Sequence, residues 1–219
     1  LIFAWPLFIF TKDQPSTSTS ITQSIKEGLQ TLKSTIKKTK QYKNIALFLL
    51  AHMIYADALN TVFAFGGIVA STLFHMSFNN IILFGIGMNL AAGIGASILA
   101  WTDDKKGSKV TIGFSLILMT LSVSGLLLTH KVLWFWIFGM GLSFCIGPIQ
   151  AASRTLLIRI TPSALITEMF GLYNLTGKIT SFIGPWIIAI ILSHSNNLRI
   201  AMSSVIVMLI AGTLILFFV

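Results

Sequence analysis

Charged residues are scarce in this chain of 219 residues. Asp, Glu, Lys and Arg make up 10% of it, whereas a typical soluble domain carries about 25%. Apolar residues make up 55%, and the mean hydropathy is +0.87. So few charges cannot cover a water-exposed surface. The composition therefore excludes an ordinary soluble domain and predicts an all-α membrane protein in a lipid bilayer.

Cysteine and clustered metal ligands are also lacking. The single cysteine, Cys145, lies inside an apolar run, which excludes a disulfide framework and a thiolate metal site. The histidines are scattered and lie mostly near the ends of apolar runs: His52, His75, His130 and His194. The sequence contains no H-E-x-x-H pair and no phosphate-binding Walker loop. We therefore expect no enzyme, no cofactor and no metal site.

The chain opens without methionine and without the basic leader of a signal peptide. Its first ten residues, 1–10, are apolar, and we expect them to be the end of a truncated transmembrane helix, so that the chain is a fragment. Residues 11–44 are polar and basic. Apolar residues recur there every three or four positions, which is the period of one helix face: Ile21, Ile25, Leu29, Leu32 and Ile36. A basic amphipathic helix on an anionic membrane surface fits this pattern, and a solvated linker helix is the alternative.

Six apolar runs of membrane-spanning length follow, each near or above the ~20 residues that a bilayer requires. We expect the spans at about residues 45–74, 79–101, 110–129, 132–152, 169–192 and 200–219. Connections that would lie on one side (11–44, 102–109 and 153–168) carry twelve Lys and Arg, and the opposite connections carry two. This bias predicts that residues 11–44 and the C-terminus are cytoplasmic. Membrane topology thus explains the net charge of +9 without a nucleic-acid partner.

Small residues recur every four positions in the second run. Gly85, Asn89, Gly93 and Ser97 form one such face, and Ala92, Ala96 and Ala100 form another. Faces of this kind let helix backbones approach closely. Helix packing is the expected role, and lining a pore is the alternative.

Two charged residues, Asp57 and Lys178, lie deep inside apolar runs. Each comes roughly ten to thirteen residues in from the cytoplasmic start of its run, where an ionisable group costs at least ~2.5 kcal/mol. Both runs enter from the same side, so an Asp57–Lys178 pair is geometrically allowed. Such a pair would respond to a proton or a substrate on the wall of a polar cavity. A structural salt bridge that only fixes helix packing is the alternative.

Further polar residues share helix faces with these two charges. Asn60 lies on the face of Asp57, and Asn174 lies on the face of Lys178. The expected substrate-cavity residues are therefore Asp57, Asn60, Asn174 and Lys178. The opposite charges would suit a small zwitterion such as an amino acid.

Two Gly-Pro steps lie inside the predicted spans. They are Gly147-Pro148 and Gly184-Pro185. Proline removes a backbone hydrogen bond and kinks a helix, and membrane helices tolerate this where their neighbours satisfy the freed groups. The two kinks would be hinges of a moving bundle or static bends.

Several segments resemble a transporter family. Asp104-Lys105-Lys106-Gly107-Ser108-Lys109 resembles the D-R-x-G-x-K turn of the major facilitator superfamily, with Gly107 suited to a positive φ. Three longer segments resemble the vacuole-effluxer-type branch, the autophagy-related protein 22-like or "unknown major facilitator" family. They are Tyr55-x-Asp57-x-Leu59-Asn60-Thr61, Gly147-Pro148-x-Gln150-Ala151-Ala152-Ser153-Arg154 and Phe170-Gly171-Leu172-Tyr173-x-x-x-Gly177-Lys178.

The resemblance covers essentially the whole chain and implies a secondary transporter with twelve helices in two halves. Residues 45–219 would be the six-helix C-terminal half, and the N-terminal half would be its missing partner. The transporter would move a small solute by alternating access. The cytoplasmic gate would comprise Asp103, Asp104, Lys105, Gly107, Lys109, Arg154 and Glu168.

The resemblance also suggests a substrate and a location. Amino acids are the candidate substrate, because family members are associated with amino-acid efflux from the vacuole, and a proton is the candidate coupling ion. The membrane would be the plasma membrane of a bacterium or the vacuolar membrane of a eukaryote. A complete six-helix membrane protein with a structural or accessory role is the alternative.

Overall fold

The computed structural model describes residues 42–219, and this part consists of helices without a strand. In chain order the elements are α3 (Lys43–Phe74), α4 (Phe78–Lys106), α5 (Ser108–Leu128), α6 (Val132–Ile160), η2 (Ser163–Leu165), α7 (Ile166–Ile179), α8 (Ile183–Ser195) and α9 (Leu198–Phe217). With η2, α7 and α8 taken as one interrupted segment, the described part has six segments long and apolar enough to cross a membrane. The predictions for residues 1–10 and for the amphipathic helix within 11–44 lie outside the described residues.

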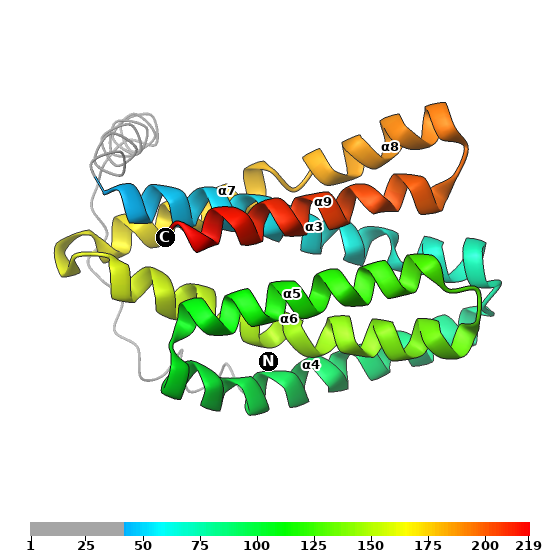
Figure 1. Cartoon of the computed structure of the whole chain (residues 1–219), viewed down its shortest axis with the longest axis horizontal. Helices are drawn as coiled ribbons and strands as arrows, with labels where there is room; N and C mark the ends of the chain where they lie inside the picture. The colour runs from blue at the N-terminus through cyan, green and yellow to red at the C-terminus, as the bar shows by residue number, and fades with distance from the viewer. Residues whose placement is uncertain (1–41) are drawn as a thin grey trace, which may run out of the picture. The chain divides into compact units, whose positions relative to one another are not determined.

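The helices form a bundle in which α3 and α9 lie side by side and α4 and α5 both pack on α6 (Figure 1). Contacts between α5 and α9 join these two groups, and α8 packs on α9. Large side chains fill the spaces between helices, among them Phe48, Ile112, Phe135, Leu157 and Leu209. Many large apolar side chains instead point outward, for example on α4 and α8, as expected for helices that face lipid.

Two helices run well past the apolar windows that predicted them. α4 continues to Lys106, so Gly107 alone separates it from α5, and α6 continues to Ile160. Gly107 has φ +91°, which a residue without Cβ adopts without steric cost. The expected connections at 102–109 and 153–168 were therefore too long. Hydropathy detects the part of a helix inside hydrocarbon, whereas its backbone hydrogen bonds continue into the polar interface.

Close approach of α4 and α6 depends on small residues. A Cβ atom at Gly95 would meet the backbone carbonyl of Phe144. A Cβ atom at Gly147 would lie 2.7 Å from the carbonyl oxygen of Ala92 and 2.8 Å from the Cβ of Ala96. The predicted packing face through Ala92 and Ala96 is thus present. The glycine face is different, because a Cβ atom at Gly93 would meet nothing within 4 Å among the described residues.

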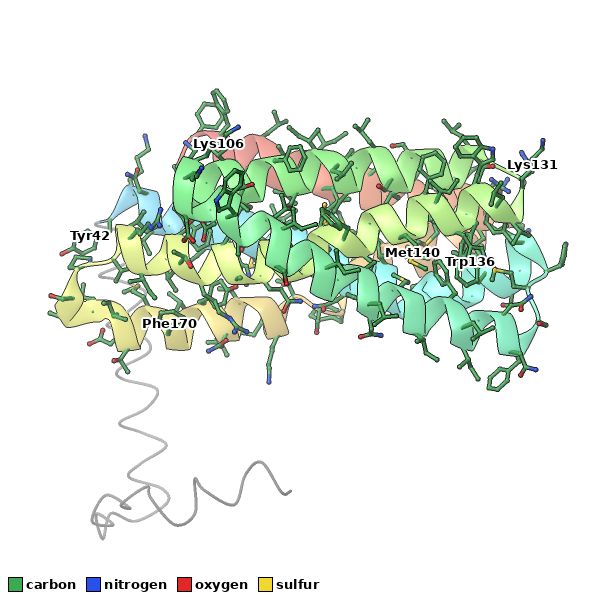
Figure 2. All side chains as sticks on the ribbon, turned by 90° about the horizontal axis from the view of Figure 1, so that it is seen from below. Tyr42, Lys106, Lys131, Trp136, Met140 and Phe170 are labelled. Carbon is green, nitrogen blue, oxygen red and sulfur yellow. The ribbon has the colours of Figure 1, made fainter. Side chains whose placement is uncertain are left out.

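The two ends of the bundle carry basic side chains. Lys106 and Lys131 lie at opposite ends (Figure 2). Beside Lys131, the Arg199 guanidinium donates hydrogen bonds to the backbone carbonyls of Leu127 and, at 2.7 Å, Thr129. Carbonyls at a helix C-terminus lack partners within the helix, and a cation also complements the helix dipole there. Arg199 therefore stabilises the end of α5 from the start of α9.

The fifth span is interrupted near its middle. α7 ends at Ile179 and α8 begins at Ile183, and the break between them is visible in Figure 1. Pro185 lies in the first turn of α8, where its missing N–H removes no helical hydrogen bond. The expected kink at Gly184-Pro185 is therefore a full break. At the other Gly-Pro step, α6 continues through Pro148 as one helix.

Candidate functional site

A polar cavity of about 220 Å³ lies among α3, α6 and α7. Its polar side chains come from all three helices: Asn60 from α3; Gln150, Ser153 and Arg154 from α6; Asn174 and Lys178 from α7. Five of them are exposed at the rim of the cavity: Asn60, Gln150, Arg154, Asn174 and Lys178. The cavity is thus open on one face of the bundle, and its rim is polar and basic.

Three of the four predicted substrate-cavity residues meet in this cavity, and Asp57 does not. Asn60, Asn174 and Lys178 line the wall. The Asp57 side chain is only 1% exposed and is directed to α8. Its Oδ2 accepts a hydrogen bond of 2.8 Å from the backbone N–H of Gly184. The expected Asp57–Lys178 pair was therefore wrong, since the two side chains face different surroundings.

The break between α7 and α8 explains the position of the Asp57 carboxylate. The first N–H groups of a helix have no partner within it, and the helix dipole is positive at that end. Gly184 is the second residue of α8, so its N–H is one of these unpaired donors. The Asp57 side chain, which comes from α3, therefore acts as a cap for α8.

The contact between α3 and α8 leaves no room for a side chain at position 184. A Cβ atom at Gly184 would meet Oγ1 of Thr61 and lie 3.4 Å from Oδ2 of Asp57. The Thr61 hydroxyl donates a hydrogen bond of 2.7 Å to the Asp57 backbone carbonyl, which fixes its place in this contact. The second carboxylate oxygen, Oδ1, is buried without a hydrogen-bond partner. Asp57 is thus held by one short contact to the broken helix.

Hydroxyl groups connect α3 and α6 at the floor of the cavity. Tyr55 Oη and Ser153 Oγ lie 2.7 Å apart, and Ser153 Oγ donates to the carbonyl of Ile149 at 2.5 Å. The single hydroxyl hydrogen of Ser153 is used in that second bond, so Tyr55 is the donor in the first. Both side chains are buried. The pair fixes the position of α6 next to Arg154.

Replacing Tyr55 by phenylalanine is expected to lower the free energy of unfolding by about 1 kcal/mol, because one buried hydrogen bond is lost. Denaturant titration of the detergent-solubilised protein would measure this change. Tyr42→Phe is the matched control, since Tyr42 is 40% exposed and its hydroxyl can bond to water. Equal stability of the two variants would contradict the assignment.

Aromatic rings close the cavity on the side of α7. The rings of His52 and Tyr173 are stacked, with centroids 3.9 Å apart, and His52 meets Tyr55 edge-on at 5.3 Å. The Tyr173 hydroxyl is close to the side chains of Ser153 and Arg154. His52 is only 8% exposed and lies within this cluster, although histidines near the ends of apolar runs are usually found at the membrane interface.

The predicted cytoplasmic-gate residues occupy more than one place. The α4–α5 junction carries Asp103, Asp104, Lys105, Gly107 and Lys109; Glu168 lies in the first turn of α7; and Arg154 lies on the cavity wall. Arg154 was expected in a connection and is instead within α6, because that helix extends to Ile160. This places its charge beside the predicted cavity residues.

At the α4–α5 junction, the backbone and two lysine side chains interact with other groups of this chain. The Gly107 N–H donates to the Asp103 carbonyl at 3.0 Å. Lys105 Nζ lies 3.8 Å from the centre of the Trp101 ring, and Lys109 Nζ donates to the Phe217 carbonyl at 3.0 Å. Lys109 therefore stabilises the end of α9, and its role in a gate stays a prediction.

Several cavity residues were not predicted from the sequence, although a signal was present. Tyr55, Gln150, Ser153 and Tyr173 all belong to the three segments that carry the family resemblance. A hydropathy pattern counts tyrosine with the apolar residues and ends the α6 span before Ser153. Only the packing of three helices shows that these side chains share one wall.

A second cavity, of about 230 Å³, is mostly apolar and lies among α3, α4, α5, α6 and α9. Phe63 lines both cavities. Within residues 42–219, no group of three or more His, Cys, Asp or Glu side chains could hold a metal ion.

Comparison with known proteins identifies the family. A protein-family model described as "Vacuole effluxer Atg22 like" matches residues 1–219. The chain belongs to this Atg22-like family. It is 28% identical over 188 residues to a Bacillus subtilis protein described as an uncharacterized MFS-type transporter, YxiO, a match that covers 86% of this chain and 44% of that protein.

Fungal proteins named autophagy-related protein 22 are also similar to the chain. The Candida glabrata protein is 27% identical over 188 residues, which cover 80% of this chain and 35% of that protein. The Saccharomyces cerevisiae protein is 22% identical over 184 residues, which cover 78% and 35%. The chain thus spans less than half the length of these Atg22-like relatives.

Family and architecture agree with the fold predicted from the sequence. The chain is an all-α, multi-pass membrane protein with the six-helix half of a major facilitator fold, and its Atg22-like relatives are described as an effluxer family and an MFS-type transporter.

Proposed function

We propose that the chain forms one half of a secondary transporter that moves a small solute, with amino acids as the substrate class, by alternating access. The observation that carries this proposal is the exposed basic rim of the polar cavity. Lys178 lies about 18 Å along α7 from its first residue, at a rise of 1.5 Å per residue. Hydrocarbon disfavours a charge by about 2.5–3.5 kcal/mol at the centre of a membrane. This face of the bundle therefore needs water or a further part of the protein, and a transport path supplies both.

A second set of helices would complete the cavity. Relatives more than twice as long as the matched segment support this proposal, and an N-terminal six-helix half is the expected partner. A volume of about 220 Å³ is below the ~300–1,000 Å³ of typical ligand sites, as expected when one wall is contributed from elsewhere. Rocking of the two halves would open the site to each side in turn.

The cavity residues, the α4–α5 junction and the break before α8 would have different roles in transport. Asn60, Arg154, Asn174 and Lys178 would contact the solute. The α4–α5 junction would close the cytoplasmic side against the other half. The break before α8 would let α7 tilt relative to α8, with the Asp57–Gly184 hydrogen bond as its fixed point.

Orientation and coupling complete the proposal. The end of the bundle with Lys106 would be cytoplasmic, following the positive-inside bias. The membrane would be the plasma membrane of a bacterium or the vacuolar membrane of a eukaryote, since the similar proteins come from a bacterium and from fungi. A proton gradient would drive transport. The protein would not be an enzyme.

The test is transport by the full-length protein in lipid vesicles. Wild-type vesicles loaded with a mixture of unlabelled amino acids should exchange them for labelled amino acids added outside. Lys178→Met should reduce this exchange about tenfold or more, because a charge-assisted contact to the solute is worth roughly 1.5–3 kcal/mol. Imposing a pH gradient on the same vesicles would test proton coupling.

Lys131→Gln is the matched control for Lys178→Met, since it also removes one lysine charge, at an exposed position outside the cavity. It should leave exchange unchanged. The proposal fails if wild-type vesicles exchange no amino acid, or if Lys178→Met and Lys131→Gln behave alike.

A further inference from the structure

The charged side chains of the cavity are all of one sign. Arg154 and Lys178 lie on its wall, and the wall contains no carboxylate among the described residues. The sequence placed Asp57 opposite Lys178, which suited a zwitterion. In the structure the Asp57 carboxylate is committed to the Gly184 N–H and is buried away from the cavity.

From this charge distribution we infer that the cavity binds the anionic group of a small solute, a carboxylate or a phosphate, between Arg154 and Lys178. This inference deepens the proposed function and rests on it for the identity of the site. It assigns no ammonium-binding role to this half of the protein. A cationic group of the solute would have to be recognised by residues outside the described part.

The neighbours of Arg154 favour this role. The Tyr173 hydroxyl is close to it, and Ser153, the preceding residue, is fixed by Tyr55 at 2.7 Å. Hydroxyl groups orient a guanidinium without neutralising it, so its charge stays available. A guanidinium also presents parallel N–H donors that match the two oxygens of a carboxylate or a phosphate.

The amide side chains support the same arrangement. Asn60, Gln150 and Asn174 line the cavity together with the two cations. Each amide NH₂ group can donate to an anionic oxygen, and each amide oxygen can accept from a hydroxyl group elsewhere on the solute. Lys178, with its compact charge on a flexible stem, can follow the anion as the site opens and closes.

The experiment measures binding separately from transport. Thermal stability of the full-length protein in detergent would be recorded with the common L-amino acids, their carboxamides, simple mono- and dicarboxylates, and inorganic phosphate. Each carboxamide keeps the ammonium group of its parent and lacks the carboxylate. Stabilisation by acids and not by the matched amides is expected. Stabilisation by phosphate as well would assign phosphate-bearing solutes to the same site.

The variants decide whether these two residues are responsible. For the anion that stabilises most, Arg154→Gln and Lys178→Gln should each weaken binding about tenfold or more, and Arg154→Lys should weaken it less. Lys131→Gln, which removes a charge outside the cavity, should not change it. Unchanged melting temperatures without ligand would show that the variants fold.

Three results would overturn the inference: amides that bind as well as acids, variants that bind the anion like wild type, or no stabilisation by any anion of the panel. Failure of the proposed function is distinguishable. A protein that transports a solute without an anionic group remains a transporter but lacks this specificity. A protein that binds anions through Arg154 and Lys178 but moves nothing across vesicles keeps the site and loses the transport role.

Discussion

Replacing Gly95 by alanine is expected to destabilise the helical bundle by about 3 kcal/mol or more, because the interior has no space for one further methyl group. The new Cβ would overlap the backbone carbonyl of Phe144 on α6. A side chain could rotate away, but the Phe144 carbonyl is part of the α6 backbone and can move only with the helix. The only relief is separation of α4 from α6, which breaks the neighbouring contact of Ala92 with Gly147 as well.

Gly93→Ala is the matched control, two residues away on the same helix. A Cβ at Gly93 meets nothing within 4 Å in the described part, and alanine favours a helix over glycine by about 1 kcal/mol. This variant should therefore be at least as stable as wild type. Denaturant titration in detergent gives both free energies of unfolding. Comparable values for the two variants would refute the close contact between α4 and α6.

Replacing Asp57 by alanine is expected to lower the free energy of unfolding by about 2–3 kcal/mol, because the Gly184 N–H then lies buried without an acceptor. The loss of a negative charge at the positive end of α8 adds to this cost. Asp57→Asn keeps an oxygen that can accept the same hydrogen bond, so it should lose less than half as much. Denaturant titration would again give the values.

Comparing Asp57→Ala with Asp57→Asn separates the stability contributed by the hydrogen bond to Gly184 from that contributed by the negative charge. Asp104→Ala serves as the control, since that carboxylate is exposed and its removal should change stability by less than about 0.5 kcal/mol. If Asp57→Asn is as unstable as Asp57→Ala, the charge stabilises the protein and the hydrogen bond does not. If both variants are as stable as wild type, Asp57 does not cap α8.

The cap also bears on how the two parts of the broken span can move. α7 contributes Asn174 and Lys178 to the cavity, and α8 is held to α3 through Gly184. A tilt of α7 would therefore change the cavity while α8 stays in place. Asp57→Ala removes the hydrogen bond that holds α8 to α3. We therefore expect transport by this variant in vesicles to fall more than transport by Asp57→Asn.

The number and approximate positions of the spans could be read from the sequence, because burial in hydrocarbon requires about 20 apolar residues in a row whatever the neighbours are. The ends of the helices could not. Lys106 and Arg154 belong to helices and not to connections, since backbone hydrogen bonds continue where the apolar run has stopped. The charge of Arg154 was therefore expected at a gate, and the structure places it in the cavity.

The depth of a charge in the membrane is a property of the sequence, but its direction is not. Counting residues placed Asp57 and Lys178 at similar depth, and the depth of each demanded a polar partner. Which partner is used depends on the rotation of each helix and on where a neighbouring helix breaks. The break before α8 frees an N–H that lies 2.8 Å from Asp57. No pattern of periodicity in α3 alone could reveal that donor.

By itself, the sequence determined that this is a six-span membrane protein with charges that need a polar surrounding, because length and hydropathy are local properties of the chain. The tertiary structure alone decided which charges share that surrounding. The Asp57 carboxylate accepts a hydrogen bond from the Gly184 N–H, whereas Lys178 and Arg154 line the same cavity. Side-chain partners across helices follow from packing, and packing depends on all the helices at once.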